Sequence, residues 1–104
     1  MYEGDFMNDK REGNGKFIYE DGKYYIGQYK DNLRNGKGIE YYKNGNIMYE
    51  GDFINDKREG FGKYIDETGD YYIGQFKDNL SNGKGILYDK NGNIIYEGDF
   101  INNK

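Results

Sequence analysis

Six amino-acid types are missing from this chain of 104 residues: alanine, valine, proline, cysteine, tryptophan and histidine. Without cysteine the chain can form neither a disulfide framework nor a thiolate metal site. Histidine is also absent, Ser81 is the only serine and Thr68 is the only threonine, so the groups of a nucleophilic triad are lacking. We therefore predict a protein that is not an enzyme and that uses no cofactor or metal.

Long apolar runs are missing as well, so we expect neither a signal peptide nor a membrane span and predict a cytoplasmic protein. The formal net charge is -4 and the isoelectric point is about 4.8. A net negative body is repelled by nucleic acid and by anionic lipid. Nucleic acid is therefore disfavoured as a partner, and an anionic membrane stays open only as a weaker alternative.

Glycine and tyrosine are abundant, with 17 and 13 residues, and they follow a fixed pattern. Each of five tyrosines has a glycine two residues later, and the first four also have glycines eleven, thirteen and twenty residues later; the anchors are Tyr2, Tyr25, Tyr49, Tyr72 and Tyr96. A fixed period of this length marks stacked units that are too small to bury a core alone. We predict a single domain, 1–104, with units 2–24, 25–48, 49–71 and 72–95 and a half unit 96–104.

The anchor spacing alternates between 23 and 24 residues, and 37 of the 47 positions in 1–47 are identical in 48–94. In the longer units Asn44-Gly45, flanked by β-forming residues, predicts a two-residue type I′ hairpin loop. That loop places Gly38 opposite Gly51, Glu40 opposite Tyr49 and Tyr42 opposite Ile47.

The shorter units keep the glycines paired only if their loop has an odd number of residues. Glu20-Asp21-Gly22 is therefore predicted as a three-residue hairpin that sets Gly15 opposite Gly27. The other connections, such as 7–12 and 30–35, read as polar loops of about six residues. The predicted fold class is all-β: a single-layer antiparallel meander of about nine short strands, open and twisted, with a shallow groove.

Strand alternation predicts what the two faces of the sheet carry. One face should hold Tyr49, Gly51 and Phe53, with their aromatic rings over Gly36 and Gly38 of the neighbouring strand. The opposite face should hold Glu50, Asp52, Lys37 and Met48, with Lys37 and Asp52 as a cross-strand ion pair.

The sequence Tyr-Glu-Gly-Asp-Phe, followed by Arg-Glu-Gly-x-Gly-Lys and a turn glycine in 2–22 and 49–69, resembles the membrane occupation and recognition nexus (MORN) repeat. Where that family favours tryptophan the chain has other aromatic residues: Phe6, Tyr29, Phe53, Phe76 and Phe100. The resemblance implies an elongated sheet of stacked hairpins whose groove binds a partner protein or peptide and which often mediates dimerisation. It also implies, for some members, binding of phospholipid head groups.

The tyrosines off the glycine pattern are predicted to be partly exposed and to line the partner-binding groove, with two carboxylates as an acidic rim; the set is Tyr19, Tyr24, Tyr41, Tyr42, Tyr88, Glu50 and Asp52. We expect a partner that brings apolar anchors and basic flanks, which includes the hypothesis of an inhibitor that blocks a basic site. The alternatives are a phospholipid-surface adaptor and a homo-oligomerising module. The identical terminal segments 2–6 and 96–100 offer open strand edges for a homodimer.

Two patterns resemble a catalytic and a metal-binding motif, but we interpret both as structural. Carboxylate pairs such as Glu50 with Asp52 recur at every second anchor, which favours a solvated face over acid-base catalysis. The segment 89–93 faintly resembles a calcium loop, but its glycine comes too early and the distal glutamate is missing, so we predict a hairpin turn.

Overall fold

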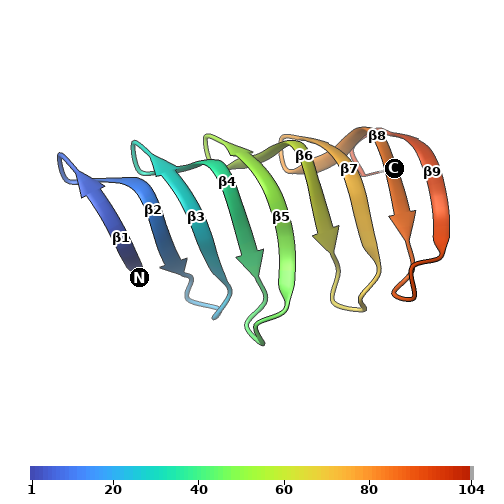
Figure 1. Cartoon of the computed structure of the whole chain (residues 1–104), viewed down its shortest axis with the longest axis horizontal. Helices are drawn as coiled ribbons and strands as arrows, with labels where there is room; N and C mark the ends of the chain where they lie inside the picture. The colour runs from blue at the N-terminus through green and yellow to red at the C-terminus, as the bar shows by residue number, and fades with distance from the viewer. Residues whose placement is uncertain (104) are drawn as a thin grey trace.

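The computed structural model describes residues 1–103, and this part of the chain folds as one antiparallel sheet of nine strands. The strands are β1 (Tyr2–Met7), β2 (Lys10–Ile18), β3 (Tyr24–Lys30), β4 (Leu33–Tyr41), β5 (Ile47–Ile54), β6 (Lys57–Ile65), β7 (Tyr71–Lys77), β8 (Leu80–Tyr88) and β9 (Ile94–Phe100). Their order in the sheet is their order in the sequence, so each interior strand lies between its two chain neighbours (Figure 1). The predicted all-β meander is confirmed. Within residues 1–103 no helix has the length and apolarity needed to cross a bilayer.

One transverse row of glycines sets the register of the whole sheet. Gly38 pairs with Gly51 and with Gly27, and the row continues through every strand; its members are Gly4, Gly15, Gly27, Gly38, Gly51, Gly62, Gly74, Gly85 and Gly98. The predicted pairing of glycine with glycine is therefore confirmed in both the shorter and the longer units.

The hairpin loops along one edge all have three residues, so the predicted type I′ loop at Asn44-Gly45 is wrong. The Gly45 N–H donates to the Tyr42 carbonyl at 2.9 Å, and the Tyr42 N–H donates to the Asn46 carbonyl at 2.8 Å. Tyr41, not Tyr42, is the residue opposite Ile47. The extra residue of the longer unit is absorbed as a bulge at Met48, between the pairs Glu40–Tyr49 and Tyr41–Ile47.

The bulge also changes the face on which Met48 packs, and its predicted place beside Glu50 on the charged face is wrong. Met48 is buried, with 6% of its surface exposed, and its sulfur lies 3.6 Å from the Arg58 guanidinium. Glu50, Asp52 and Lys37 do share the charged face, and the Lys37–Asp52 ion pair is present. The shorter units have the predicted three-residue loop, since the Gly22 N–H donates to the Tyr19 carbonyl at 3.0 Å.

Two-residue turns join the strands along the other edge of the sheet, in place of the predicted polar loops of about six residues (Figure 1). Both residues of these turns have positive φ, as a type I′ turn requires; Asn55 has 49° and Asp56 has 70°. Asparagine and aspartate tolerate this left-handed conformation better than other residues with a Cβ atom. The strands therefore continue up to the turn, and part of each predicted loop is strand.

These turns are bonded to one another along the edge. The Asn79 N–H donates to the Arg58 carbonyl at 3.1 Å, and the Asn79 Oδ1 accepts from the Arg58 N–H at 2.9 Å. The same reciprocal pair joins Asp56 to Arg34, and it recurs between Asn32 and Arg11 and between Asn103 and Ser81. Each repeat is thus clamped to the preceding one by a turn side chain.

We expect Asn79→Ala to lower the free energy of unfolding by about 2 kcal/mol, because it removes the acceptor for the Arg58 N–H and places alanine in a left-handed conformation. Asp9→Ala is the matched control. Asp9 holds the same turn position, with φ of 65°, but it follows β1, which has no strand before it to clamp. Urea denaturation should show a loss of only about 1 kcal/mol for the control. Equal losses in the two variants would disprove the clamp.

Aromatic rings cover the glycine row on one face of the sheet. We call this the aromatic face; it carries Tyr25, Tyr49 and Tyr72 and the side chains that point to the same side of the sheet. The Tyr49 ring lies over Gly51 and over Gly62 of the following strand, not over Gly38 of the preceding strand as predicted. Gly38 is covered by Tyr25. Only a residue without a Cβ atom leaves room for a ring at this distance from the sheet.

Edge-to-face contacts connect these rings into a continuous chain. Tyr49 meets Phe53 at a centroid distance of 5.2 Å and Phe76 at 5.1 Å, and Tyr72 meets Phe76 at 5.2 Å. Tyr25, Tyr49 and Phe53 are the largest fully buried side chains of the described residues. A single layer has no second sheet to cover it, so this chain of rings is the core.

Glu40 interrupts the row of apolar side chains on the aromatic face. Its Oε1 lies 2.7 Å from the Arg58 Nε and its Oε2 lies 3.4 Å from the Arg34 Nη1, with only 13% of its side chain exposed. The two guanidinium groups lie over the Phe53 ring and the Tyr64 ring, at 4.9 and 5.0 Å. Arg34 also pairs with Asp56, whose Oδ1 lies 3.3 Å from the Arg34 Nε. Two carboxylates thus balance the two guanidinium groups, and this face presents little free charge near the centre of the sheet.

Candidate functional site

The predicted site residues are all partly exposed or exposed, but the structure distributes them over three surfaces. Tyr24, Tyr41 and Tyr88 lie with Glu50 and Asp52 on the face opposite the aromatic face. Tyr19 lies on the aromatic face itself. Tyr42 lies at the loop edge. This separation could not be predicted from strand alternation, because alternation ends where the loops begin.

We call the face that carries Tyr24, Tyr41 and Tyr88 the isoleucine face, after its central side chains Ile26, Ile39, Ile73 and Ile86. Tyr24 stacks on Tyr41 across β3 and β4 with a centroid distance of 4.6 Å. Tyr88 stacks at 4.8 Å on Tyr71, a residue absent from the predicted site. The internal duplication could have found it, because Tyr71 is the equivalent of Tyr24, 47 residues later.

The carboxylates on this face do not form a purely acidic rim. Asp52 is paired with Lys37, and Glu50 lies opposite Lys63 in the register of β5 and β6. The Lys63 Nζ also lies 4.6 Å from the centroid of the Tyr71 ring. The face is therefore a mixture of both charges around apolar side chains, and it is not selective for a basic partner by net charge.

Tyr19 closes a small hollow on the aromatic face, with a volume of about 120 Å³. Its ring lies 5.0 Å from that of Phe17, and Arg11 and Arg34 line the same hollow. Burial raises the pKa of Tyr19, so its hydroxyl is neutral at physiological pH.

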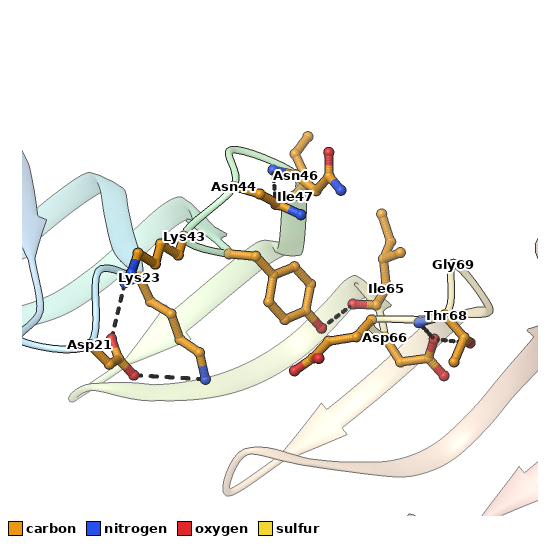
Figure 2. Close-up of a pocket in the computed structure, with 12 residues that line it drawn as sticks. Asp21, Lys23, Lys43, Asn44, Asn46, Ile47, Ile65, Asp66, Thr68 and Gly69 are labelled. Carbon is orange, nitrogen blue, oxygen red and sulfur yellow. Dashed lines mark hydrogen bonds and ion pairs between the residues drawn. The ribbon is translucent and has the colours of Figure 1, made fainter.

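A wide cavity opens at the loop edge, between the tips of the hairpins β2–β3, β4–β5 and β6–β7, and we call it the tip cleft. Its volume is about 1060 Å³, and its walls are Asp21, Lys23, Tyr42, Lys43, Asn44, Asn46, Ile47, Ile65, Asp66, Glu67, Thr68 and Gly69. Figure 2 shows Asp21 and Lys23 on one side of the cleft and Ile65, Asp66 and Thr68 on the other. Tyr42, Ile47 and Ile65 supply its apolar surface.

Tyr42 joins the two sides of the tip cleft. Its hydroxyl donates a hydrogen bond of 2.6 Å to the Ile65 carbonyl, from β4–β5 to the end of β6. Burial raises the pKa of Tyr42, and the neighbouring Tyr64 hydroxyl and the Glu67 and Asp66 carboxylates act in the same direction. The hydroxyl therefore stays protonated and remains a donor.

The carboxylates of the tip cleft are held in different ways. Asp66 Oδ1 accepts from the Thr68 N–H at 2.9 Å and from the Asp70 N–H at 3.2 Å, which fixes the loop. Glu67 is exposed. Asp21 pairs with Lys23 at 3.9 Å on the opposite side. Among residues 1–103, no group of three or more histidine, cysteine, aspartate or glutamate side chains has an arrangement that could hold a metal ion.

Stacked antiparallel hairpins whose length alternates between 23 and 24 residues, held by a row of glycines under aromatic rings, define a β-hairpin repeat protein. A family model described as the MORN repeat matches residues 2–24, 25–47, 49–71 and 72–94. The chain therefore belongs to the MORN repeat family, and the resemblance found in its sequence is confirmed. MORN repeats commonly mediate protein or membrane interactions, and the proteins that carry them are generally non-enzymatic binding modules.

Proposed function

We propose that this chain is a non-catalytic binding module whose tip cleft holds an extended segment of a partner protein. The observation that carries the proposal is the composition of the cleft: an apolar floor of Tyr42, Ile47 and Ile65, with Glu67 and Asp66 at one side. Tyr42 is the one tyrosine of the predicted site that lines this cavity. An apolar side chain of the partner would fill the floor, and a neighbouring lysine or arginine would face the carboxylates.

The geometry favours an extended segment over a folded domain. The cleft runs across three hairpin tips, and adjacent strands in a sheet are about 4.8 Å apart. A strand-like segment presents alternate side chains to one side, which matches an apolar floor with a charged side. The exposed Glu67 provides the charge that selects a basic residue, since Asp21 is already paired.

The test measures binding of a labelled peptide that alternates isoleucine and lysine, by fluorescence anisotropy, against the same peptide with glutamate in place of lysine. We expect the lysine peptide to bind more tightly, and Glu67→Lys to weaken it by about tenfold or more. Glu20→Lys is the matched control, because Glu20 holds the same loop position in β2–β3 but does not line the cleft. Both substitutions change the net charge equally.

Binding that is weakened equally by the two substitutions would show that the effect comes from net charge, and it would contradict binding in the tip cleft. If neither peptide binds, the proposal is contradicted as well. Preference for the glutamate peptide would place the partner's charge on the Lys23 and Lys43 side and overturn the proposed basic partner.

A further inference from the structure

The isoleucine face is a second surface, separate from the tip cleft. On this face the strand register aligns one side chain from every strand into a single row across the sheet. From β1 to β9 the row reads Glu3, Lys16, Ile26, Ile39, Glu50, Lys63, Ile73, Ile86 and Glu97. The order glutamate, lysine, isoleucine, isoleucine repeats every four strands.

This row is open to solvent at its apolar positions. Ile26 is 43% exposed, and Ile39, Ile73 and Ile86 are each partly exposed. The stacked pairs Tyr24–Tyr41 and Tyr71–Tyr88 lie next to them along the same strands. The face therefore has two equal apolar patches, each with a lysine on one side and a glutamate on the other. Patches rich in tyrosine and isoleucine with charged borders are typical of protein interfaces.

We propose that the isoleucine face binds a second copy of this chain, face to face, about a two-fold axis that runs parallel to the strands between β5 and β6. This axis reverses the row in the second copy. Glu50 then faces Lys63 of the partner subunit, and Ile39 faces Ile73 of the partner subunit. Ile26 faces the partner's Ile86, and Lys16 faces the partner's Glu97. Across β2 to β9 every charge of the row meets its opposite and every isoleucine meets an isoleucine, and Glu3 of β1 lies beyond the overlap.

The rows beside it are compatible with the same axis. Tyr41 meets Tyr71 of the partner subunit, and Tyr24 meets Tyr88 of the partner subunit, so the stacked pairs of one copy cover those of the other. On the other side Lys37 meets the partner's Gln75, and no like charges are brought together. Aromatic pairs of this kind add to the free energy gained by burying their area.

Other axes fit less well. A two-fold axis along the row, instead of along the strands, leaves the row in the same direction in both copies and sets glutamate against glutamate and lysine against lysine. Axes parallel to the strands but centred between β3 and β4, or between β7 and β8, keep the charges complementary, but fewer strands then overlap. The axis between β5 and β6 overlaps the most strands of the three.

The face is large enough for a stable dimer. The molecule measures 46 × 27 × 17 Å, and its broad outline exceeds the ~800 Å² that each partner buries in a typical specific interface. Two sheets that pack face to face keep their mean strand directions within about 30° of each other, because each sheet is twisted. The pairs closest to the axis, Glu50 with Lys63 and Ile39 with Ile73, are therefore in the tightest contact, and these are the positions to alter.

The experiment uses two single substitutions of the full chain, Glu50→Lys and Lys63→Glu, with mass measured by analytical ultracentrifugation over a range of concentrations. The unaltered chain of 12.2 kDa should form dimers. Each variant alone should have a dimer dissociation constant raised by at least about tenfold, because symmetry creates each like-charge contact twice. An equimolar mixture of the two variants should form a heterodimer, since the introduced lysine of one then meets the introduced glutamate of the other.

Mixing the variants distinguishes loss of this interface from damage within one chain. Glu50 and Lys63 are also neighbours within one chain, and a local loss of stability would not be repaired by mixing. A monomeric unaltered chain would overturn the proposal, and so would variants that stay monomeric when mixed. Dimers that persist in both variants would also overturn it and would place the contact at the strand edges 2–6 or 96–100. Neither residue lines the tip cleft, so failure here leaves the peptide proposal untouched.

Discussion

Gly62→Ala is expected to lower the free energy of unfolding by about 3 kcal/mol or more, although it adds only a methyl group. A Cβ atom at this position would lie 2.5 Å from the Tyr49 Oη and 2.7 Å from its Cε1. The ring cannot move away, because Tyr49 is fully buried between Phe53 and Phe76. Its hydroxyl is also fixed by donation to the Asp52 carbonyl at 2.9 Å.

Gly15→Ala is the control for this substitution. Gly15 belongs to the same glycine row and lies beneath the Tyr2 ring. Tyr2 is on the outermost strand and only partly buried, so its ring can swing toward solvent. Urea denaturation should therefore show a smaller loss for Gly15→Ala than for Gly62→Ala. A loss at Gly62 no larger than that at Gly15 would mean that the rings do not hold the register.

High pH is expected to unfold the protein because its core tyrosines must remain neutral. Burial raises the pKa of Tyr29 to about 12, and burial also raises the pKa of Tyr25 and Tyr49. In the unfolded chain these groups ionise near pH ~10. Ionisation would also remove the hydrogen bonds that Tyr25 and Tyr49 donate to the Gln28 and Asp52 carbonyls.

The direction of the effect follows from proton binding. Below about pH 10 both states hold these protons, and stability does not depend on them. As the pH rises from there through the folded-state pKa values, the unfolded chain releases its protons first and stability falls. Each tyrosine contributes about 1.4 kcal/mol per pH unit, so the three together contribute about 4 kcal/mol per pH unit.

The measurement is the urea midpoint as a function of pH, followed with the ultraviolet absorbance of tyrosinate. Tyr29→Phe should reduce the slope above pH ~10 by about one proton. The unaltered chain is the reference for this slope. A slope in Tyr29→Phe identical to that of the unaltered chain would show that Tyr29 does not keep its proton in the folded state.

The register of the sheet could be predicted from sequence because it depends on the spacing of glycines, and spacing is visible in one chain. The predicted and observed turn types differ for a physical reason. Asn44-Gly45 is a strong signal for a two-residue turn, but the same two residues also fit the end of a three-residue loop when a bulge at Met48 absorbs the difference. The Asn55-Asp56 turn contains no glycine, so its left-handed conformation could not be predicted from the spacing of glycines.

The candidate site could be predicted less completely than the fold. Partial exposure of the off-pattern tyrosines follows from strand alternation, and Tyr24, Tyr41 and Tyr88 do share a face. The tip cleft depends on where three loops end in space, and Glu67 lines it only because neighbouring hairpins stack. The balance of charge on the isoleucine face depends on how side chains from all the strands align. The sequence of a single repeat does not contain that alignment.

The sheet order has a consequence for how the chain acquires its structure. Since neighbours in space are neighbours in sequence, forming a native contact requires only a short loop to close, and little entropy is lost in bringing distant segments together. Folding can therefore start at any hairpin and spread by adding one strand at a time. During synthesis, each hairpin can join the sheet as soon as it leaves the ribosome, without waiting for the end of the chain.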